Sequence, residues 1–177
     1  MDLKENKNRP ILATVYAIIF LILLLLVKLN SPIVHGIDHI VQSIVFSFTN
    51  EHLTVLISIL TNFGSPVVSL ILACLVLAFV FFKREYAAAI WGFGTLIIGN
   101  GLAWVFKHIA ARPRPALAQR LAPAHGYSFP SGHVFGTTLF VLLLLTLIVP
   151  RIKNHTTQSV IRVLAVIWVI FIMLSRI

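Results

Sequence analysis

The residues best suited to chemistry are concentrated in one stretch, Trp104–Gly136. Its first half contains Lys107 and Arg114, and prolines at positions 113 and 115 flank the arginine. These prolines prevent a regular helix, so Arg114 is presented from a stiff, extended turn. A lysine ammonium is a compact charge and an arginine guanidinium a planar fork of donors, and both suit phosphate oxygens. Taken alone, this half is explained equally well by a basic loop that grips lipid headgroups.

The second half of this stretch ends in Pro130-Ser131-Gly132-His133. We expect Ser131 to be the N-cap of a helix, with Gly132 and His133 in its first turn. Free backbone N–H groups and the positive end of the helix dipole would then bind an anion, which Gly132 allows to approach closely. His133 could donate a proton to it near neutral pH. Taken alone, this half is explained better by a plain helix cap with an interfacial histidine.

The elements that position these residues are predicted to be membrane-spanning helices. Hydrophobic residues make up 59% of the 177 positions and charged residues only 11%, against roughly 25% charged residues in soluble domains. A span needs roughly 20 apolar residues, and we predict five spans: Ile11–Val27, Pro66–Phe82, Ala87–Phe106, Val134–Val149 and Ile161–Leu174. The predicted fold is an all-α, polytopic transmembrane helix bundle with interfacial helices over residues 31–61. Residues 1–10 are predicted to form a cytoplasmic tail, and residues 11–177 a single membrane-embedded domain.

Loop charges predict the sidedness of the bundle. Basic residues in the N-terminal tail and around Lys83 and Arg151 indicate the cytoplasmic side. By the number of spans between them, the loop Lys107–His133 and Arg176 share the opposite, extracytoplasmic side. The net charge of +9 lies in short loops between spans, so we expect anionic lipid headgroups and phosphates as partners rather than nucleic acid.

The two halves of the basic stretch together form a specific pattern. Lys107 is followed by six residues and Arg114-Pro115, and Pro130-Ser131-Gly132-His133 begins 15 positions after that proline. From about Asp38 to its end, the chain resembles the type 2 phosphatidic acid phosphatase superfamily, the membrane lipid-phosphate phosphatases related to vanadium haloperoxidases.

This resemblance implies a role for each residue. Lys107 and Arg114 would bind the phosphoryl oxygens. Ser131 and Gly132 would help to hold the same group, and His133 would protonate the leaving alkoxide or phosphate. The resemblance also implies an active site without a metal or other cofactor, in agreement with the lack of any Asp or Glu after Glu85.

The family's third motif is Ser-Arg, five residues, His, three residues and Asp. Ser175-Arg176 matches its start, so Arg176 would be a further phosphate ligand. Only Ile177 follows, so the nucleophilic histidine, its aspartate and the sixth span of the family core have no counterpart in these residues. We therefore expect the 177 residues alone to be inactive in turnover.

The predicted function is hydrolysis of the phosphate or diphosphate of a membrane lipid through a phosphohistidine intermediate. Phosphatidic acid, phosphatidylglycerophosphate and a polyprenyl diphosphate such as undecaprenyl diphosphate remain equal candidates, and the oligomeric state stays open. The alternative is a membrane protein that binds lipid phosphates without catalysis. A small transporter or channel is disfavoured, because no predicted span carries a charged residue near its centre.

Overall fold

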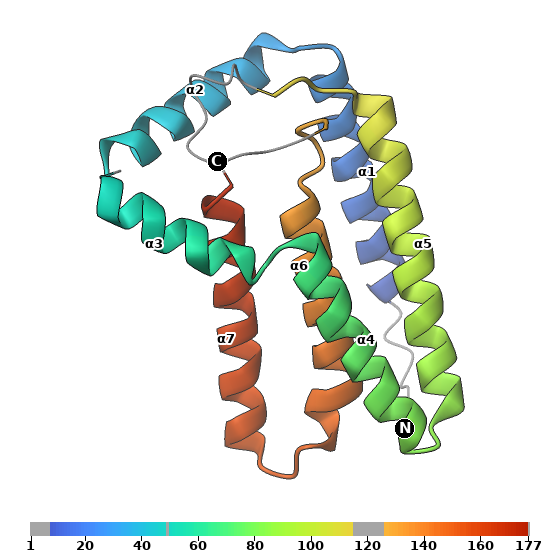
Figure 1. The fold of residues 1–177 in the computed structure, drawn as a ribbon. Helices are drawn as coiled ribbons and strands as arrows, with labels where there is room; N and C mark the ends of the chain where they lie inside the picture. Colours follow the sequence, from blue (N-terminus) through green and yellow to red (C-terminus); the bar gives the residue numbers. More distant parts are fainter. Residues whose placement is uncertain (1–7, 49, 115–125, 177) are drawn as a thin grey trace.

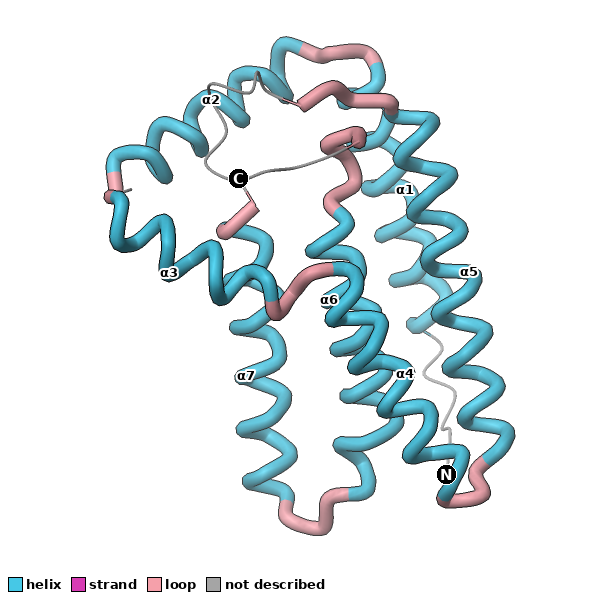
Figure 2. Tube along the Cα trace, viewed as in Figure 1, coloured by secondary structure: helices cyan, strands magenta, loops and turns pink. Residues whose placement is uncertain are grey.

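The computed structural model describes residues 8–48, 50–114 and 126–176, and the predicted all-α fold is confirmed for this part of the chain. The helices are α1 (Asn8–Lys28), α2 (Pro32–Ser47), α3 (Glu51–Asn62), α4 (Pro66–Phe82), α5 (Tyr86–Ala110), α6 (Gly132–Leu143) and α7 (His155–Leu174). The π-helical turn η2 (Leu144–Ile148) and the 3-10 turn η3 (Val149–Arg151) extend α6. Figures 1 and 2 show α4 to α7 side by side, with α2 and α3 across one end.

Among the residues that the structure describes, five helical segments are long and apolar enough to span a membrane, as predicted: Pro10–Lys28, Glu51–Phe82, Tyr86–Ala110, Gly132–Arg151 and His155–Leu174. The second contains 32 residues, which as one helix would measure about 48 Å and exceed the roughly 30 Å hydrocarbon core. The turn Phe63–Ser65 breaks it, so α4 alone forms the predicted span.

Some helix limits differ from the prediction. The first helix begins at Asn8 rather than Ile11, with Pro10 in its first turn, where proline is tolerated. The last helix begins at His155 rather than Ile161, since the side chain of Asn154 accepts a hydrogen bond from the Thr157 N–H at 3.2 Å.

The predicted interfacial segment forms two helices at the end of the bundle (Figure 1). The Asn50 side chain caps α3 by accepting from the Leu53 N–H at 2.8 Å. The Ser65 hydroxyl caps α4 by accepting from the Val68 N–H at 3.3 Å, and Pro66 occupies its first turn. None of the α2 residues is buried, which suits a helix that rests on the bundle and the lipid.

The main core lies between α4, α5 and α6. Its buried members are all aliphatic: Ala73, Val76, Leu77, Val80, Ala89, Leu96, Leu143 and Leu147. Gly92 allows a close approach, since a Cβ added there would lie 2.4 Å from Leu77 Cδ2. Many other large apolar side chains are exposed, as expected where acyl chains replace water around a span.

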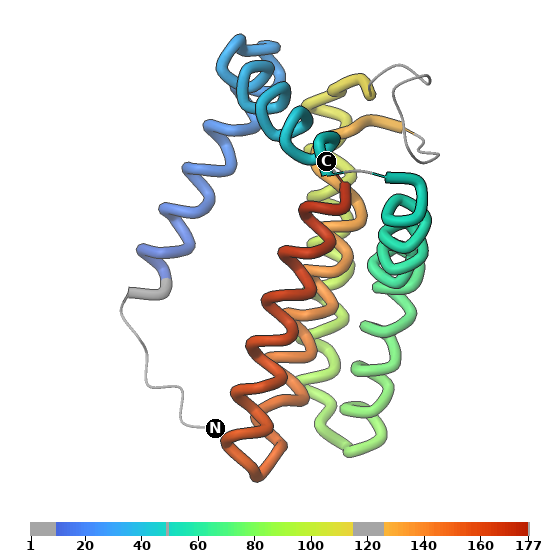
Figure 3. The backbone as a smooth tube through the Cα atoms, turned by 90° about the vertical axis from the view of Figure 1, so that its left-hand side faces the viewer, coloured from blue at the N-terminus to red at the C-terminus, as the bar shows by residue number. Residues whose placement is uncertain are grey.

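A second cluster attaches α1 to the end of the bundle that carries α2. Leu24 and Val27 of α1 are buried with Ala110 of α5. The ring of Phe20 lies 4.9 Å from that of Phe106 and 6.2 Å from that of Phe129. Figure 3 shows α1 leaning away from the bundle towards its N-terminal end. This cluster therefore holds Phe129, the residue before Pro130-Ser131-Gly132-His133.

The opposite end of the bundle carries the short loops that follow α4 and α6 (Figure 1). Arg151 forms an ion pair with Glu85 there. The pair joins two loops whose basic residues were predicted to share one side.

Candidate functional site

Four basic side chains converge at the end of the bundle beneath α2. Arg176, Arg114 and Lys107 all lie close enough to the ring of His133 to interact with it electrostatically. Arg114 also acts on Lys107 and on Arg176. The four residues come from the last turn of α5, the following loop, the first turn of α6 and the end of α7, and all four are half-buried.

The exit from α5 sets the direction of the loop that carries Arg114. Ala111 adopts the left-handed conformation with φ 46°, and its N–H donates to the Lys107 carbonyl at 3.0 Å. For a residue other than glycine this conformation costs about 1–2 kcal/mol, so neighbouring contacts must hold it. Pro113 then prevents any return to helix, as predicted.

The loop residues 112–114 lie beside residues 126–128, just before α6. The Ser128 N–H donates to the Arg112 carbonyl at 2.9 Å. Lys107 Nζ donates to the Tyr127 carbonyl at 3.0 Å, and Arg114 Nε donates to the Gly126 carbonyl at 2.9 Å. These bonds orient both cations, and the ammonium of Lys107 retains two further N–H donors for an anion.

The N-terminus of α6 points backbone donors into the same region. Ser131 occupies the predicted N-cap position, but its hydroxyl makes no capping hydrogen bond. The first N–H groups of a helix have no intrahelical acceptor, so those that follow Ser131 are available to an oxyanion. The positive end of the helix dipole favours the same ligand.

Close packing fixes α6 against the beginning of α4. A Cβ at Gly132 would lie 3.3 Å from Pro66 Cγ, and one at Gly136 would lie 3.3 Å from Ser69 Cβ. The buried hydroxyl of Thr137 donates to the Gly64 carbonyl at 3.2 Å. These contacts position the first turn of α6, and with it Gly132 and His133.

Arg176 is positioned by the end of α7. The fully buried side chain of Ile172 fills a notch at Gly64, where an added Cβ would lie 2.4 Å from Ile172 Cδ1. Burial, and secondly the charge of Arg114, lower the pKa of Arg176, although a guanidinium remains protonated in proteins. Half-buried like charges repel one another, so a bound anion would relieve an existing electrostatic cost.

The structure brings together Lys107, Arg114, His133 and Arg176, and places Ser131 and Gly132 at the start of the helix that carries His133. The sequence places two further basic residues, Arg120 and His125, in the same loop, and both lie outside the described residues. Within the described part of the chain, no group of three or more His, Cys, Asp or Glu side chains could hold a metal ion.

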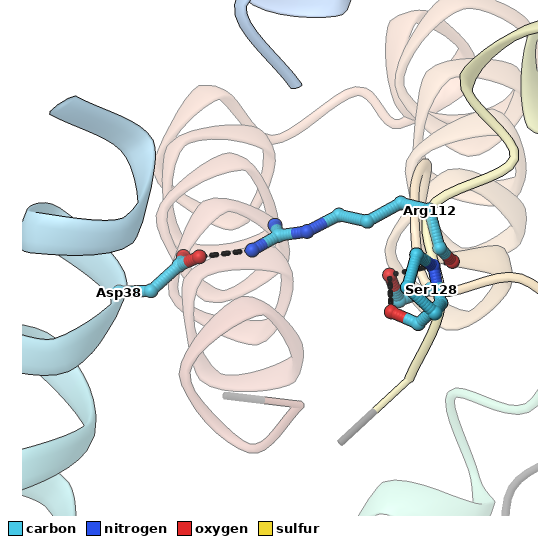
Figure 4. A network of polar contacts seen from close by, with 4 residues as sticks. Asp38, Arg112 and Ser128 are labelled. Carbon is cyan, nitrogen blue, oxygen red and sulfur yellow. Dashed lines mark hydrogen bonds and ion pairs between the residues drawn. The ribbon is translucent and has the colours of Figure 1, made fainter. Parts of the chain in front are cut away.

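Sequence reasoning missed the partner of Arg112. Its guanidinium forms an ion pair with Asp38 of α2, and Figure 4 shows this pair together with Ser128. The sequence feature that could have indicated this pair is the scarcity of acidic residues, since the chain contains only five Asp and Glu. An isolated acidic residue in an amphipathic helix is a candidate partner for an arginine elsewhere.

Fold and site define a class of protein: a polytopic membrane protein with a cluster of basic side chains at one end of its helix bundle. Residues 88–177 match the model of the PAP2 superfamily, and the chain belongs to that family. Its fold is similar to the crystal structure of the first transmembrane PAP2 type phosphatidylglycerolphosphate phosphatase from Bacillus subtilis. The TM-score is 0.72 at 18% sequence identity, over 90% of this chain and 80% of the other. No curated protein sequence matches the chain.

Proposed function

We propose that this protein acts as an integral membrane phosphatase on the phosphate or diphosphate of a lipid. The observation that carries this proposal is the convergence of Lys107, Arg114 and Arg176 on His133 at a helix N-terminus. Membership of the PAP2 superfamily supports the same reaction class.

The proposed chemistry is charge stabilisation and proton transfer. Lys107, Arg114 and Arg176 hold the phosphoryl oxygens, and the N–H groups of the first α6 turn, with Ser131 and Gly132, hold the same group. Such preorganised donors stabilise the charge that develops in the transition state without a metal. His133 delivers a proton to the departing alkoxide or phosphate oxygen.

The nucleophilic step requires a histidine on the opposite side of phosphorus, because the attacking and leaving atoms lie in line. His133 cannot be both nucleophile and proton donor, so the proposal assigns a phosphohistidine to a residue of the family's third motif. The 177 residues contain no histidine after His155. They therefore supply the phosphate-binding and proton-donating parts of the site.

The candidate substrates are phosphatidic acid, phosphatidylglycerophosphate and a polyprenyl diphosphate. The similar solved structure is described as a phosphatidylglycerolphosphate phosphatase. This description supports keeping phosphatidylglycerophosphate among the candidate substrates. The proposed location is the cell membrane, with the site facing the extracytoplasmic side, since the basic loops around Lys83 and Arg151 lie at the other end.

Phosphate release from short-chain forms of the three lipids, measured with EDTA present, tests this function. A longer chain in which Arg176 is followed by the rest of the third motif, that is five residues, His, three residues and Asp, should release phosphate. Residues 1–177 alone should not. Replacement of His133 by Ala in the extended chain should abolish release. An extended chain that binds lipid phosphates without turnover would support the non-catalytic alternative. Turnover by residues 1–177 would show that another residue of these 177 has the nucleophile's role, and would contradict this mechanism.

A further inference from the structure

We infer that Asp38 is a positioning residue of the phosphate site: it holds Arg112 in place and, through Arg112, the backbone that presents Arg114. Because the proposed function assigns Arg114 to phosphate, this inference depends on that function. Asp38 itself is not expected to touch the ligand.

Arg112 is fixed at both of its ends. Its guanidinium pairs with Asp38, and the two side chains are only 24% and 35% exposed. Its carbonyl accepts from the Ser128 N–H at 2.9 Å, and the Ser128 hydroxyl lies 3.1 Å from the Pro113 carbonyl. Figure 4 shows Arg112 reaching from the loop to α2. A half-buried arginine–carboxylate pair is a stronger constraint than an exposed one.

This constraint acts two residues before Arg114. Between the end of α5 at Ala110 and Arg114 the chain passes through the left-handed Ala111, a conformation that persists where surrounding contacts determine it. The Asp38 and Ser128 contacts of Arg112 act on the residue next to Ala111, in addition to the hydrogen bonds that Lys107 and Arg114 donate to the carbonyls of Tyr127 and Gly126. Loss of the Asp38 contact should therefore loosen the backbone that carries Arg114.

Arg112 does not belong to the cation cluster itself. Among the described residues, the charges that act on His133 are those of Arg176, Arg114 and Lys107. Asp38 thus keeps one arginine directed towards α2 while Arg114 is directed towards the site. The pair also connects α2 to the site, although the two paired residues are 74 positions apart.

The sign of the effect separates positioning from simple electrostatics. Removal of a carboxylate near an anion site should strengthen anion binding, because a repulsive charge is lost and Arg112 is freed to join the cluster. Positioning predicts the reverse, because Arg114 loses its alignment. Replacement of Asp38 by Asn keeps the size of the side chain and removes its charge.

The experiment is orthovanadate titration of the purified 177-residue chain in detergent micelles. Asp38→Asn should raise the dissociation constant about tenfold, which is within the range of coupling between contacting residues. Asp38→Glu should recover most of this loss, as should the charge swap of Asp38→Arg with Arg112→Asp. The matched control is Glu85→Gln, which breaks the other arginine–carboxylate pair at the far end of the bundle and should leave vanadate affinity unchanged.

Unchanged or tighter vanadate binding by Asp38→Asn would overturn the inference. So would equal losses in Asp38→Asn and Glu85→Gln, or a loss in Asp38→Asn that neither Asp38→Glu nor the charge swap recovers. Failure of the unsubstituted chain to bind vanadate is a different result, since it would contradict the proposed function. Thermal unfolding of each variant, measured in parallel, identifies any loss of affinity that comes from unfolding.

Discussion

Replacement of Gly64 by Ala should both destabilise the protein and weaken anion binding, because Gly64 forms the notch that receives Ile172. The added Cβ would lie 2.4 Å from Ile172 Cδ1 and 2.9 Å from Ile172 Cγ1. Carbon atoms in contact prefer about 3.5–4.0 Å, so Ile172 must move by about 1 Å or more. Ile172 is fully buried, and overpacking of this kind costs about 1–3 kcal/mol.

The same displacement should reach the phosphate site. Arg176 follows Ile172 by one helical turn, so an outward shift of α7 moves its guanidinium away from Arg114 and His133. A charge-assisted hydrogen bond contributes about 1.5–3 kcal/mol, and its partial loss should weaken orthovanadate binding about five- to tenfold. Denaturation in mixed micelles and vanadate titration measure the two effects.

Two further variants make this test specific. Gly94→Ala is the control, because no heavy atom lies within 4 Å of a Cβ at that position, and an alanine inside a helix should stabilise by up to about 1 kcal/mol. Ile172→Val removes Cδ1, the atom in closest conflict, and should restore part of the stability and affinity of the Gly64→Ala protein, because the contact with Cγ1 at 2.9 Å remains. Equal stability and affinity of Gly64→Ala and the unsubstituted chain would refute the role of the notch.

Two other predictions concern the packing and the sidedness of the bundle. Thr137→Val keeps the shape of a side chain that is 1% exposed but removes the hydrogen bonds of its hydroxyl to the Gly64 carbonyl and the Ser69 hydroxyl. It should lower the free energy of unfolding by about 1–2 kcal/mol, and an unchanged value would show that these bonds do not hold α6 to α4 and the turn before it. Cys74 is the single cysteine of the sequence, so labelling starts from the Cys74→Ser chain. An impermeant maleimide should label Pro113→Cys in intact cells and Lys153→Cys only after permeabilisation, and labelling of both from one side would contradict the proposed topology.

Hydropathy and local capping chemistry predicted the spans and the start of α6. Apolar runs of this length have few alternatives to a membrane helix. Serine is a preferred N-cap residue, so the start of α6 was predictable at Ser131, although the Ser131 hydroxyl makes no capping hydrogen bond. The prolines around Arg114 predicted a non-helical loop, as the structure shows for residues 111–114, and phosphate binding by this loop stays a prediction. The spans, the start of α6 and the proline-rich loop each depend on residues close together in the chain, so they can be predicted from the sequence.

Contacts between distant residues were not predictable in the same way. The pairing of Asp38 with Arg112 joins residues 74 positions apart, and no pattern near Arg112 indicates that its partner lies in α2. The notch of Gly64 for Ile172 likewise depends on how α7 packs against the turn before α4. The left-handed Ala111 is determined by tertiary contacts that override its own preference.

The most direct test of the central claim is orthovanadate binding to the chain in which Arg114 and Arg176 are both replaced by Ala. We expect the vanadate affinity of this double variant to fall at least about a hundredfold, because two charge-assisted contacts of about 1.5–3 kcal/mol each are removed. The matched control, replacement of Arg84 and Arg151 by Ala at the far end of the bundle, should bind vanadate as tightly as the unsubstituted chain. Equal affinity in the two double variants would contradict the assignment of these cations to a phosphate site.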